Sequence, residues 1–514
     1  MGSQTQWAVA TPHALATEAG ADAFARGGNA VDAALAAAAS LTVLLPDNCG
    51  LGGDLIALVR DPSGQTSVVN ASGPAAVRTS ADDLRRRHGE KMPLYGAETV
   101  TVPGLLAGWE ALWERGARLP WADAFGAAIV QAREGVPTAR SVAHALADQR
   151  ARLSADAGMR ELFYPNGQPL AAGAALRQVP LAETLEQIAA TGARAFYAGR
   201  LGASWLATLA GPLTADDLAA FEPEITAPLR ASWGSQEVLT APPNSQGALL
   251  LMILRAIEDD PLLDPLSAEA PRLAAAFDDA VVARESFLAD PRFSEAPSEL
   301  VALAAGAGPS VLPNVAVASP RPAPRGDTVA VVAADGEGRA VSLIQSLYYA
   351  FGAGILDPAT GISAHNRGAF FSLDPSSPNV IAPGKRPAHT LTPVIVEESG
   401  SVHAVLGTMG GSAQPQIVMH LLLHLRRGLP CDRAVAAPRW LLKPDERGLV
   451  VAAETGVPTD AIRALRTAGR PVQTIAPAQS EAGQAQLIAR GADRSYQAAS
   501  DPRSEGAARV RRQH

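Results

Sequence analysis

The sequence contains little cysteine and no surplus of positive charge. Two cysteines, Cys49 and Cys431, occur in 514 residues, so the chain has no disulfide framework and its thiols fit a reducing compartment. Acidic residues outnumber basic ones and the formal net charge is −8. Nucleic-acid binding is therefore not indicated, because it requires a basic face that neutralises phosphates. The composition favours a protein that acts on a small molecule.

Export signals and long apolar segments are lacking as well. The N-terminus has no basic start followed by an apolar run, so we expect no secretion and a cytoplasmic location. The most apolar early stretch, residues 30–45, is rich in alanine, carries Asp32 and stops at Pro46. It is too short and too weakly hydrophobic to span a bilayer. We interpret it as a buried helix and expect no membrane association.

Clusters typical of a metal site are missing too. His420 and His424 have the spacing of two ligands on one helical face, but no third ligand follows and the surrounding residues are mostly leucine. The basic run at residues 85–88 is interpreted as a solvated helix face. We expect neither a metal nor a cofactor.

The chain does have alternating helix and strand patterns, with no linker long enough to separate independent domains. A Gly-rich turn at residues 50–53 leads into a strand over 55–60. Apolar spacing near the helical period predicts helices over residues 13–26, 105–115, 122–134, 181–191 and 268–290.

The centre of the chain reads PRGDTVAVVAADGEG, a Gly-Asp turn followed directly by an apolar, β-branched run that starts at Thr328. Two such runs, residues 329–334 and 340–346, flank a Gly-rich turn and predict a hairpin. An antiparallel register could bring the hydroxyl of Ser346 close to Thr328. The segment 304–325, rich in Ala, Pro and Gly, is a loop that would suit a processing site, although most such segments are simply loops.

A second pair of strands is predicted over residues 393–397 and 402–406, and the latter runs into GTMGGSAQPQ. Gly410 and Gly411 follow that strand, where successive backbone N–H groups can face an anion. A plain turn is the alternative interpretation of the two glycines.

Together these segments resemble the γ-glutamyltransferases and their relatives among the N-terminal nucleophile hydrolases. The resemblance covers nearly the whole chain and implies an α/β (α+β) fold, a four-layer αββα sandwich. It rests on the segments GGNAVDAALAAAASLTVLLPDNCGLGGD, TVPGLLAGWEAL, GDTVAVVAADGEGRAVSLIQSLYYAFGAGILDPATGI, NVIAPGKRPAHTLTPVIV, GTMGGS and SYQAASDPRSEGAA.

The resemblance implies that the precursor cuts itself between Asp327 and Thr328. Residues 1–327 would form a large subunit and residues 328–514 a small one, both folded into one intertwined domain, with a further dimer left open. Cutting gives Thr328 a free α-amine, whose ordinary pKa near 7.7–8.0 lets it accept the proton of the hydroxyl on the same residue.

The resemblance also assigns roles around this nucleophile. Gly410 and Gly411 would supply an oxyanion hole, and Ser346 stands where the family has a hydroxyl that bonds to the nucleophile. A serine that merely ends a strand is the alternative for Ser346.

The substrate-binding positions depart from the pattern of enzymes that take glutathione. In this chain Ser72 replaces the family's arginine, and His389 and Thr390 replace its Ser-Ser pair. Arg367 replaces a glutamine, Phe370 an aspartate and Tyr348 an asparagine.

These exchanges favour a substrate with an acid group and no α-amine. Phe370 cannot balance an ammonium, whereas Arg367 can pair with a carboxylate. The pattern is most similar to the branch that includes oxamate amidohydrolase. The alternatives are a γ-glutamyltransferase or glutathione hydrolase with altered clamps, and an uncut, non-enzymatic relative. Arg367 could also be structural, tied to Asp374 or a backbone carbonyl, and His389 could be a satisfied core histidine.

Overall fold

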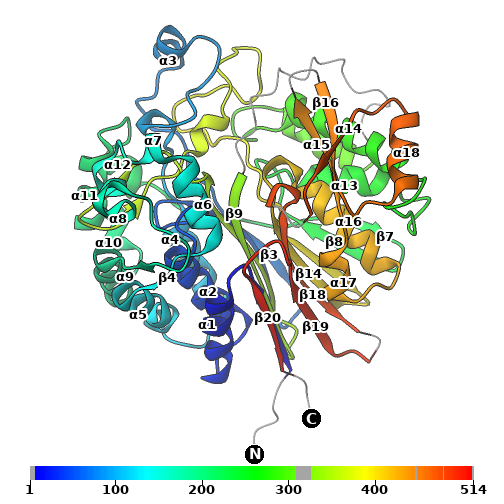
Figure 1. Ribbon diagram of the computed structural model, residues 1–514, viewed down its shortest axis with the longest axis horizontal. Helices are drawn as coiled ribbons and strands as arrows, with labels where there is room; N and C mark the ends of the chain where they lie inside the picture. The colour runs from blue at the N-terminus through cyan, green and yellow to red at the C-terminus, as the bar shows by residue number, and fades with distance from the viewer. Residues whose placement is uncertain (1–5, 308–325, 446–447, 478–479, 492, 512–514) are drawn as a thin grey trace, which may run out of the picture.

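The computed structural model describes residues 6–307, 326–445, 448–477, 480–491 and 493–511. Two antiparallel sheets lie face to face in the middle of the molecule, and helices cover the outer face of each (Figure 1). This is the four-layer αββα sandwich, so the predicted fold class is confirmed.

The first sheet has seven strands and mixes the two ends of the chain with its centre. In order across the sheet they are β20 (Ala507–Arg511), β1 (Trp7–Thr11), β9 (Gly326–Asp335), β10 (Ala340–Tyr349), β2 (Asp54–Arg60), β3 (Thr66–Ala71) and β6 (Glu224–Thr226). The predicted hairpin is confirmed as β9 and β10, which pair around the turn after Asp335.

The second sheet has six strands and lies against the first. In order they are β19 (Tyr496–Ser500), β18 (Gln484–Arg490), β14 (Ser401–Met409), β13 (Val394–Glu398), β8 (Gln236–Thr240) and β7 (Leu229–Trp233). Side chains that alternate along the strands fill the space between the sheets, among them Ile56, Val332, Ile344, Ile395 and Val405.

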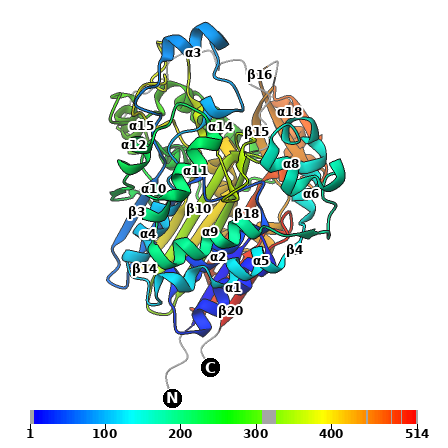
Figure 2. The ribbon, with the colours of Figure 1, turned by 90° about the vertical axis from the view of Figure 1, so that its left-hand side faces the viewer.

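Helices from the first half of the chain cover the first sheet, seen face-on in the turned view (Figure 2). They include α1 (Ala14–Ala25), α2 (Ala30–Leu44), α4 (Leu105–Glu114), α5 (Gly126–Glu134) and α9 (Val179–Thr191). Asn29 starts α2 with a capping box, in which its own side chain and that of Asp32 satisfy backbone N–H groups. Every residue of α2 is buried, as predicted for this alanine-rich stretch.

The helices on the second sheet are α13 (Gly247–Ala256), α14 (Ala270–Phe287), α15 (Ala296–Ala304), α16 (Gln414–Arg426) and α17 (Cys431–Ala436). Beside them lies a small sheet of β15 (Trp440–Asp445), β16 (Gly448–Glu454) and β17 (Val472–Ile475), with α18 (Thr459–Thr467). Further helices on the side of the first sheet are α6 (Arg140–Asp148), α7 (Arg150–Leu153), α8 (Ala157–Phe163), α10 (Arg194–Tyr197), α11 (Arg200–Leu209) and α12 (Ala215–Ala219). The helix α3 (Ala81–His88) lies apart from this layer, at the top of Figure 1.

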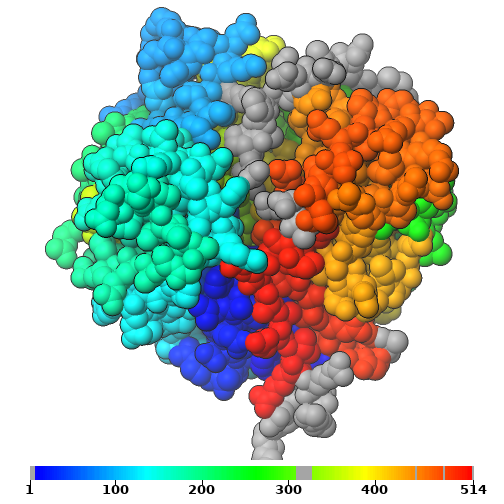
Figure 3. Space-filling model, in the orientation of Figure 1, coloured from blue at the N-terminus to red at the C-terminus, as the bar shows by residue number. Residues whose placement is uncertain are grey.

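The C-terminal strands come to the surface between the two helical layers, where they form the red band of the space-filling view (Figure 3). Within the described ranges, no helix combines the length and apolarity needed to cross a membrane. Most of the predicted processing loop, residues 308–325, lies outside the described residues.

Candidate active site

Three polar side chains from three neighbouring strands form a row at one end of the space between the sheets. Thr328 on β9 is the register partner of Ser346 on β10, and Ser346 is the partner of Asp54 on β2. Partner residues of antiparallel strands project from the same face. Ile344 and Ile56, two positions along β10 and β2, belong to the core between the sheets, so the row faces the same space.

The hydroxyl groups of Thr328 and Ser346 are in contact. Their oxygens, Oγ1 and Oγ, lie 2.9 Å apart, and Ser346 Oγ donates a hydrogen bond of 2.8 Å to the carbonyl oxygen of Asp327. Because a hydroxyl has a single hydrogen, Thr328 must be the donor to Ser346. The predicted proximity of the two hydroxyls is confirmed. One serine thus contacts both the threonine hydroxyl and the carbonyl of the preceding peptide bond.

Asp54, which the sequence analysis did not single out, is the centre of a buried charged cluster. Its Oδ2 accepts a 2.7 Å hydrogen bond from Nε2 of His389, and it lies 3.5 Å from Nε of Arg367 and 3.7 Å from Nδ1 of His365. All four side chains are fully buried. Burial alone would raise the pKa of Asp54, but His389 and Arg367 outweigh it and hold that pKa below its ordinary value. Asp54 is therefore ionised at neutral pH.

Arg367 is held by its surroundings on three sides. Its guanidinium carbon lies 3.9 Å from the centre of the Tyr348 ring, Nη1 donates to Oγ1 of Thr390 at 3.4 Å, and Nε faces Asp54. Phe370 packs on the same tyrosine. Three of the predicted substrate-binding residues, Arg367, Tyr348 and Thr390, thus lie together. The alternative partner considered for Arg367, Asp374, instead accepts hydrogen bonds from Ser376.

His389 uses both ring nitrogens within the protein. Nδ1 accepts from the backbone N–H of Leu391, and Nε2 donates to Asp54. Burial, and next the charge of Arg367, lower the pKa of His389 to about 4, so the ring is neutral. This environment matches the alternative of a satisfied core histidine. The ring contacts the charged cluster through its hydrogen bond to Asp54.

Ser72 is joined to the same cluster by hydrogen bonds. Asn244 Nδ2 donates to Ser72 Oγ at 3.0 Å, and the carbonyl oxygen of Asn244 accepts from the backbone N–H of His389 at 2.7 Å. Ser72 also borders an open cavity of about 810 Å³ whose lining includes Arg386 but not Thr328. Ser346 and Asp54 are not among the lining residues either, and Thr328 itself is only 2% exposed.

Gly410 and Gly411 follow the end of β14. Both have positive φ angles, 152° and 54°, and a Cβ at Gly410 would collide with the side chain of Ile417. Nε2 of Gln246 donates to the carbonyl oxygens of both Gly411 and Thr390, which ties the glycines to the Arg367 cluster.

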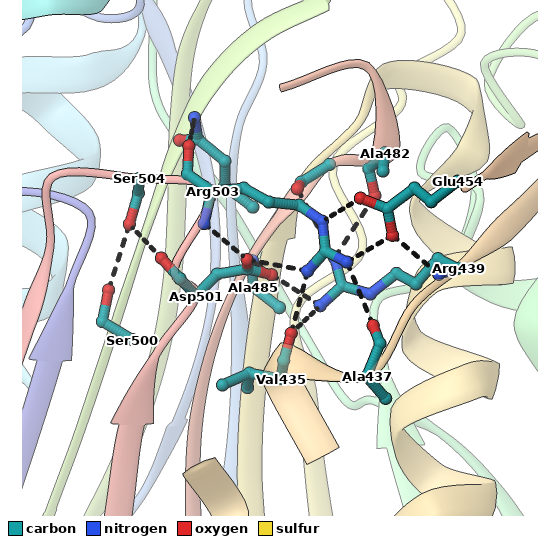
Figure 4. A network of polar contacts seen from close by, with 12 residues as sticks. Val435, Ala437, Arg439, Glu454, Ala482, Ala485, Ser500, Asp501, Arg503 and Ser504 are labelled. Atoms are coloured by element: carbon teal, nitrogen blue, oxygen red, sulfur yellow. Dashed lines mark hydrogen bonds and ion pairs between the residues drawn. The ribbon is translucent and has the colours of Figure 1, made fainter. Parts of the chain in front are cut away.

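Four buried charged side chains form a network near the start of β18 (Figure 4). Arg439 and Arg503 both pair with Asp501, at 2.5 and 3.0 Å, and Nε of Arg503 donates to Glu454 at 2.9 Å. Arg439 also donates to the backbone carbonyl of Gly483.

The network acts on the turn through β18. Asp501 accepts from the N–H of Ala485, near the start of that strand, and Gln484 is the register partner of Met409, which directly precedes Gly410. The charged network therefore fixes the strand end from which the glycine turn emerges.

In the described part of the chain, no group of three or more His, Cys, Asp or Glu side chains is arranged to hold a metal ion. Nε2 of His420 donates to the backbone carbonyl oxygen of Trp440, 2.9 Å away, and the ring packs among aromatic rings.

The αββα fold, with a threonine on a central strand beside a serine and a glycine turn, defines the class of N-terminal nucleophile hydrolases. Within it, the chain belongs to the gamma-glutamyltranspeptidase family, whose model matches residues 16–510. It is an enzyme of the amide-hydrolase and acyltransferase type, and several of its relatives are named as proenzymes.

Individual relatives differ in their named substrates. The chain is 33% identical to the oxamate amidohydrolase proenzyme of Klebsiella pneumoniae and 32% identical to a glutathione hydrolase-like proenzyme, YwrD, of Bacillus subtilis, covering 98% of both chains in each comparison. Among solved structures, cephalosporin acylase from Bacillus halodurans superposes with a TM-score of 0.88 at 31% identity, covering 99% of this chain and 96% of that one.

Proposed function

We propose that the protein cuts itself between Asp327 and Thr328 and then uses Thr328 as the nucleophile of an amide hydrolase. The observation that carries this proposal is the contact of Ser346 with both the Thr328 hydroxyl and the Asp327 carbonyl. Fragments 1–327 and 328–514 would remain folded together as large and small subunits.

The geometry supports a simple course for the cut. The Thr328 hydroxyl oxygen adds to the carbonyl carbon of Asp327, its proton passes towards Ser346, and the hydrogen bond from Ser346 stabilises the charge on the carbonyl oxygen. The C–N bond then breaks and the amide nitrogen of Thr328 takes up the proton that the hydroxyl has lost. The nitrogen thereby becomes a free amine, and an ester joins the two residues. Water hydrolyses that ester and leaves Asp327 with a carboxylate.

In the mature enzyme the new α-amine of Thr328 would act as the general base for its own hydroxyl, a contribution typically worth about 10²–10⁴ in rate. The hydroxyl would attack the substrate amide to form an acyl-enzyme, which water then hydrolyses. The backbone N–H groups of Gly410 and Gly411 would stabilise the tetrahedral oxyanion, since positive φ angles after a strand end favour such an anion-binding turn.

For the substrate we propose a small amide that carries one carboxylate, of the oxamate type. Arg367, Thr390 and Tyr348 would bind the acid group, with His389 and Ser72 behind them. The guanidinium of Arg367 is linked through Thr390 and Gln246 to the glycine turn, so a short acid could reach both. The oxamate amidohydrolase proenzyme among the relatives supports the same class.

A γ-glutamyl compound is the second candidate, because Asp54 supplies a carboxylate although Phe370 replaces the family's aspartate. Its Oδ1 has no hydrogen-bond partner among the described residues and could accept from a substrate ammonium. A glutathione hydrolase-like proenzyme is also among the relatives. We further propose a cytoplasmic location, since Cys49 and Cys431 are both buried and unpaired.

The test has two parts. Purified wild type should give two fragments on a denaturing gel, with Thr328 as the first residue of the smaller, and Thr328→Ala should stay intact. Processed enzyme is then assayed for ammonia release from oxamate and for nitroaniline release from γ-glutamyl-p-nitroanilide. Turnover of the glutamyl compound with inert oxamate would overturn the substrate proposal and leave the mechanism standing. An intact wild-type chain with full activity would overturn the mechanism.

A further inference from the structure

Asp54 stands in the same row as the two hydroxyls of the candidate nucleophile site, next to Ser346 across β2 and β10. It is the first residue of its strand and is fully buried. A buried carboxylate is costly unless a positive charge balances it. The question is which neighbouring group supplies that charge.

Arg367 supplies the positive charge that balances Asp54. His389 donates Nε2–H to Asp54 while its Nδ1 accepts a backbone hydrogen bond, so the ring is satisfied in its neutral form. Nε2 of His365 lies 2.8 Å from the carbonyl oxygen of Thr101. Arg367, which is charged at any physiological pH, lies 3.5 Å from Asp54.

Arg367 does not depend on Asp54 for its position. The stack on Tyr348 and the hydrogen bond to Thr390 already fix the plane of the guanidinium. Within the described part of the chain, its Nη2 has no hydrogen-bond partner although the side chain is fully buried. That unused donor is the group left to bind a substrate oxygen. Asp54 does not position it, but its negative charge offsets the positive charge of the guanidinium.

We propose that Asp54 determines the charge selectivity of the substrate site: as the buried counter-ion of Arg367 it makes the empty site neutral overall. This inference rests on the proposed function of Arg367. Such a neutral pair, with the unused Nη2 donor of Arg367, accepts a small amide with at most one acid group. It disfavours dicarboxylates, whose second charge would meet no cation among the side chains of this cluster.

The test compares two inhibitors that differ in charge, oxamate as the monoanion and oxamide as the neutral amide, against whichever amide the wild type hydrolyses. The measured quantity is the inhibition constant of oxamide divided by that of oxamate. Asp54→Asn keeps the shape and an acceptor for His389 but removes the charge. We expect the ratio to rise at least about tenfold, because an unbalanced buried cation attracts the anion. A purely structural Asp54 would weaken both inhibitors equally, and an unchanged ratio overturns the proposal.

A matched control is available at the far end of the same strand. Arg60, the last residue of β2, forms a buried ion pair of 2.7 Å with Glu397. Glu397→Gln removes a buried carboxylate in the same way but far from Arg367, so the ratio should stay as in the wild type.

Arg367→Gln gives a second, independent measurement if Asp54→Asn does not fold. It leaves the Asp54 charge unbalanced, so oxamide should bind more tightly than oxamate and the ratio should fall well below one. A ratio near one would mean that the charge of Asp54 does not affect inhibitor binding, and it would overturn the inference.

Self-cleavage on a denaturing gel reports separately that each variant has folded, since it needs no external acid. A ratio that Arg367→Gln does not change at all would instead remove Arg367 from the substrate site. That result would overturn the proposed function together with this inference. A ratio that changes in Arg367→Gln but only to a value near one overturns the inference alone.

Discussion

Ser346 lies 2.9 Å from the hydroxyl of Thr328 and donates a hydrogen bond to the carbonyl oxygen of Asp327. Ser346→Ala removes both contacts, and we expect self-cleavage to slow by about 10²-fold because one oxyanion donor is lost. Ser346→Thr keeps a hydroxyl and should retain more of the rate. The measurement is the time course of fragment appearance on denaturing gels, and an unchanged rate in Ser346→Ala would contradict the role.

Gly410→Ala should lower kcat by about 10²–10³ without a matching rise in KM, because the turn cannot hold its N–H groups in place. The new methyl group would collide with Ile417, and the φ of 152° disfavours any side chain. Gly400→Ala is the matched control: this glycine also has a positive φ, 72°, but has open space around it at the β13–β14 turn. Equal kinetics for the two variants would argue against the oxyanion hole.

Asp501→Asn should destabilise the protein by about 3 kcal/mol, since it leaves the buried Arg439 and Arg503 short of one negative charge. The change should also lower kcat, as the start of β18 supports the glycine turn. Urea denaturation and steady-state kinetics measure the two effects. Asp460→Asn breaks an exposed ion pair with Arg463 and should change stability by less than about 0.5 kcal/mol. Similar losses in both variants would contradict the importance of the buried network.

Asp47→Asn should stabilise the protein more at pH 8 than at pH 5. Burial raises the pKa of Asp47 to about 7 in the folded chain, against about 4 when unfolded. The folded state therefore holds an extra proton between these values, and wild-type stability is lost as the pH rises through that window. Asparagine stays neutral, so its advantage should grow to roughly 2–4 kcal/mol by pH 8. Thermal melting at several pH values measures it, and a constant difference would show that Asp47 does not titrate there.

The elements around Thr328 could be predicted because their information is local. The turn after Asp335 and the β-branched runs beside it specify a hairpin, and counting residues across that hairpin sets Ser346 opposite Thr328. Asn29 likewise marks the start of α2 through its own capping hydrogen bonds. In each case neighbouring residues determine the structure.

Asp54 could not be found in this way. It reaches the site only because β2 pairs with β10, a strand almost three hundred residues later in the chain, and its charge partner Arg367 comes from a third segment. The signal that was present is a single acidic residue at the end of CGLGGD, where glycines otherwise predict only close backbone packing. The pairing of Arg367 with Asp54 in place of Asp374 follows from the same long-range contact.

If the chain is cut between Asp327 and Thr328 as proposed, the order of strands has a practical consequence. In the first sheet β1, from the N-terminal side of Thr328, is hydrogen-bonded between β20 and β9. On the other side of the hairpin, β10 is hydrogen-bonded to β2, which also precedes Thr328 in the chain. Two polypeptides whose strands alternate in one sheet cannot separate unless that sheet unfolds. A tag on either piece would thus retrieve both, and the halves could not be exchanged between molecules once they have formed.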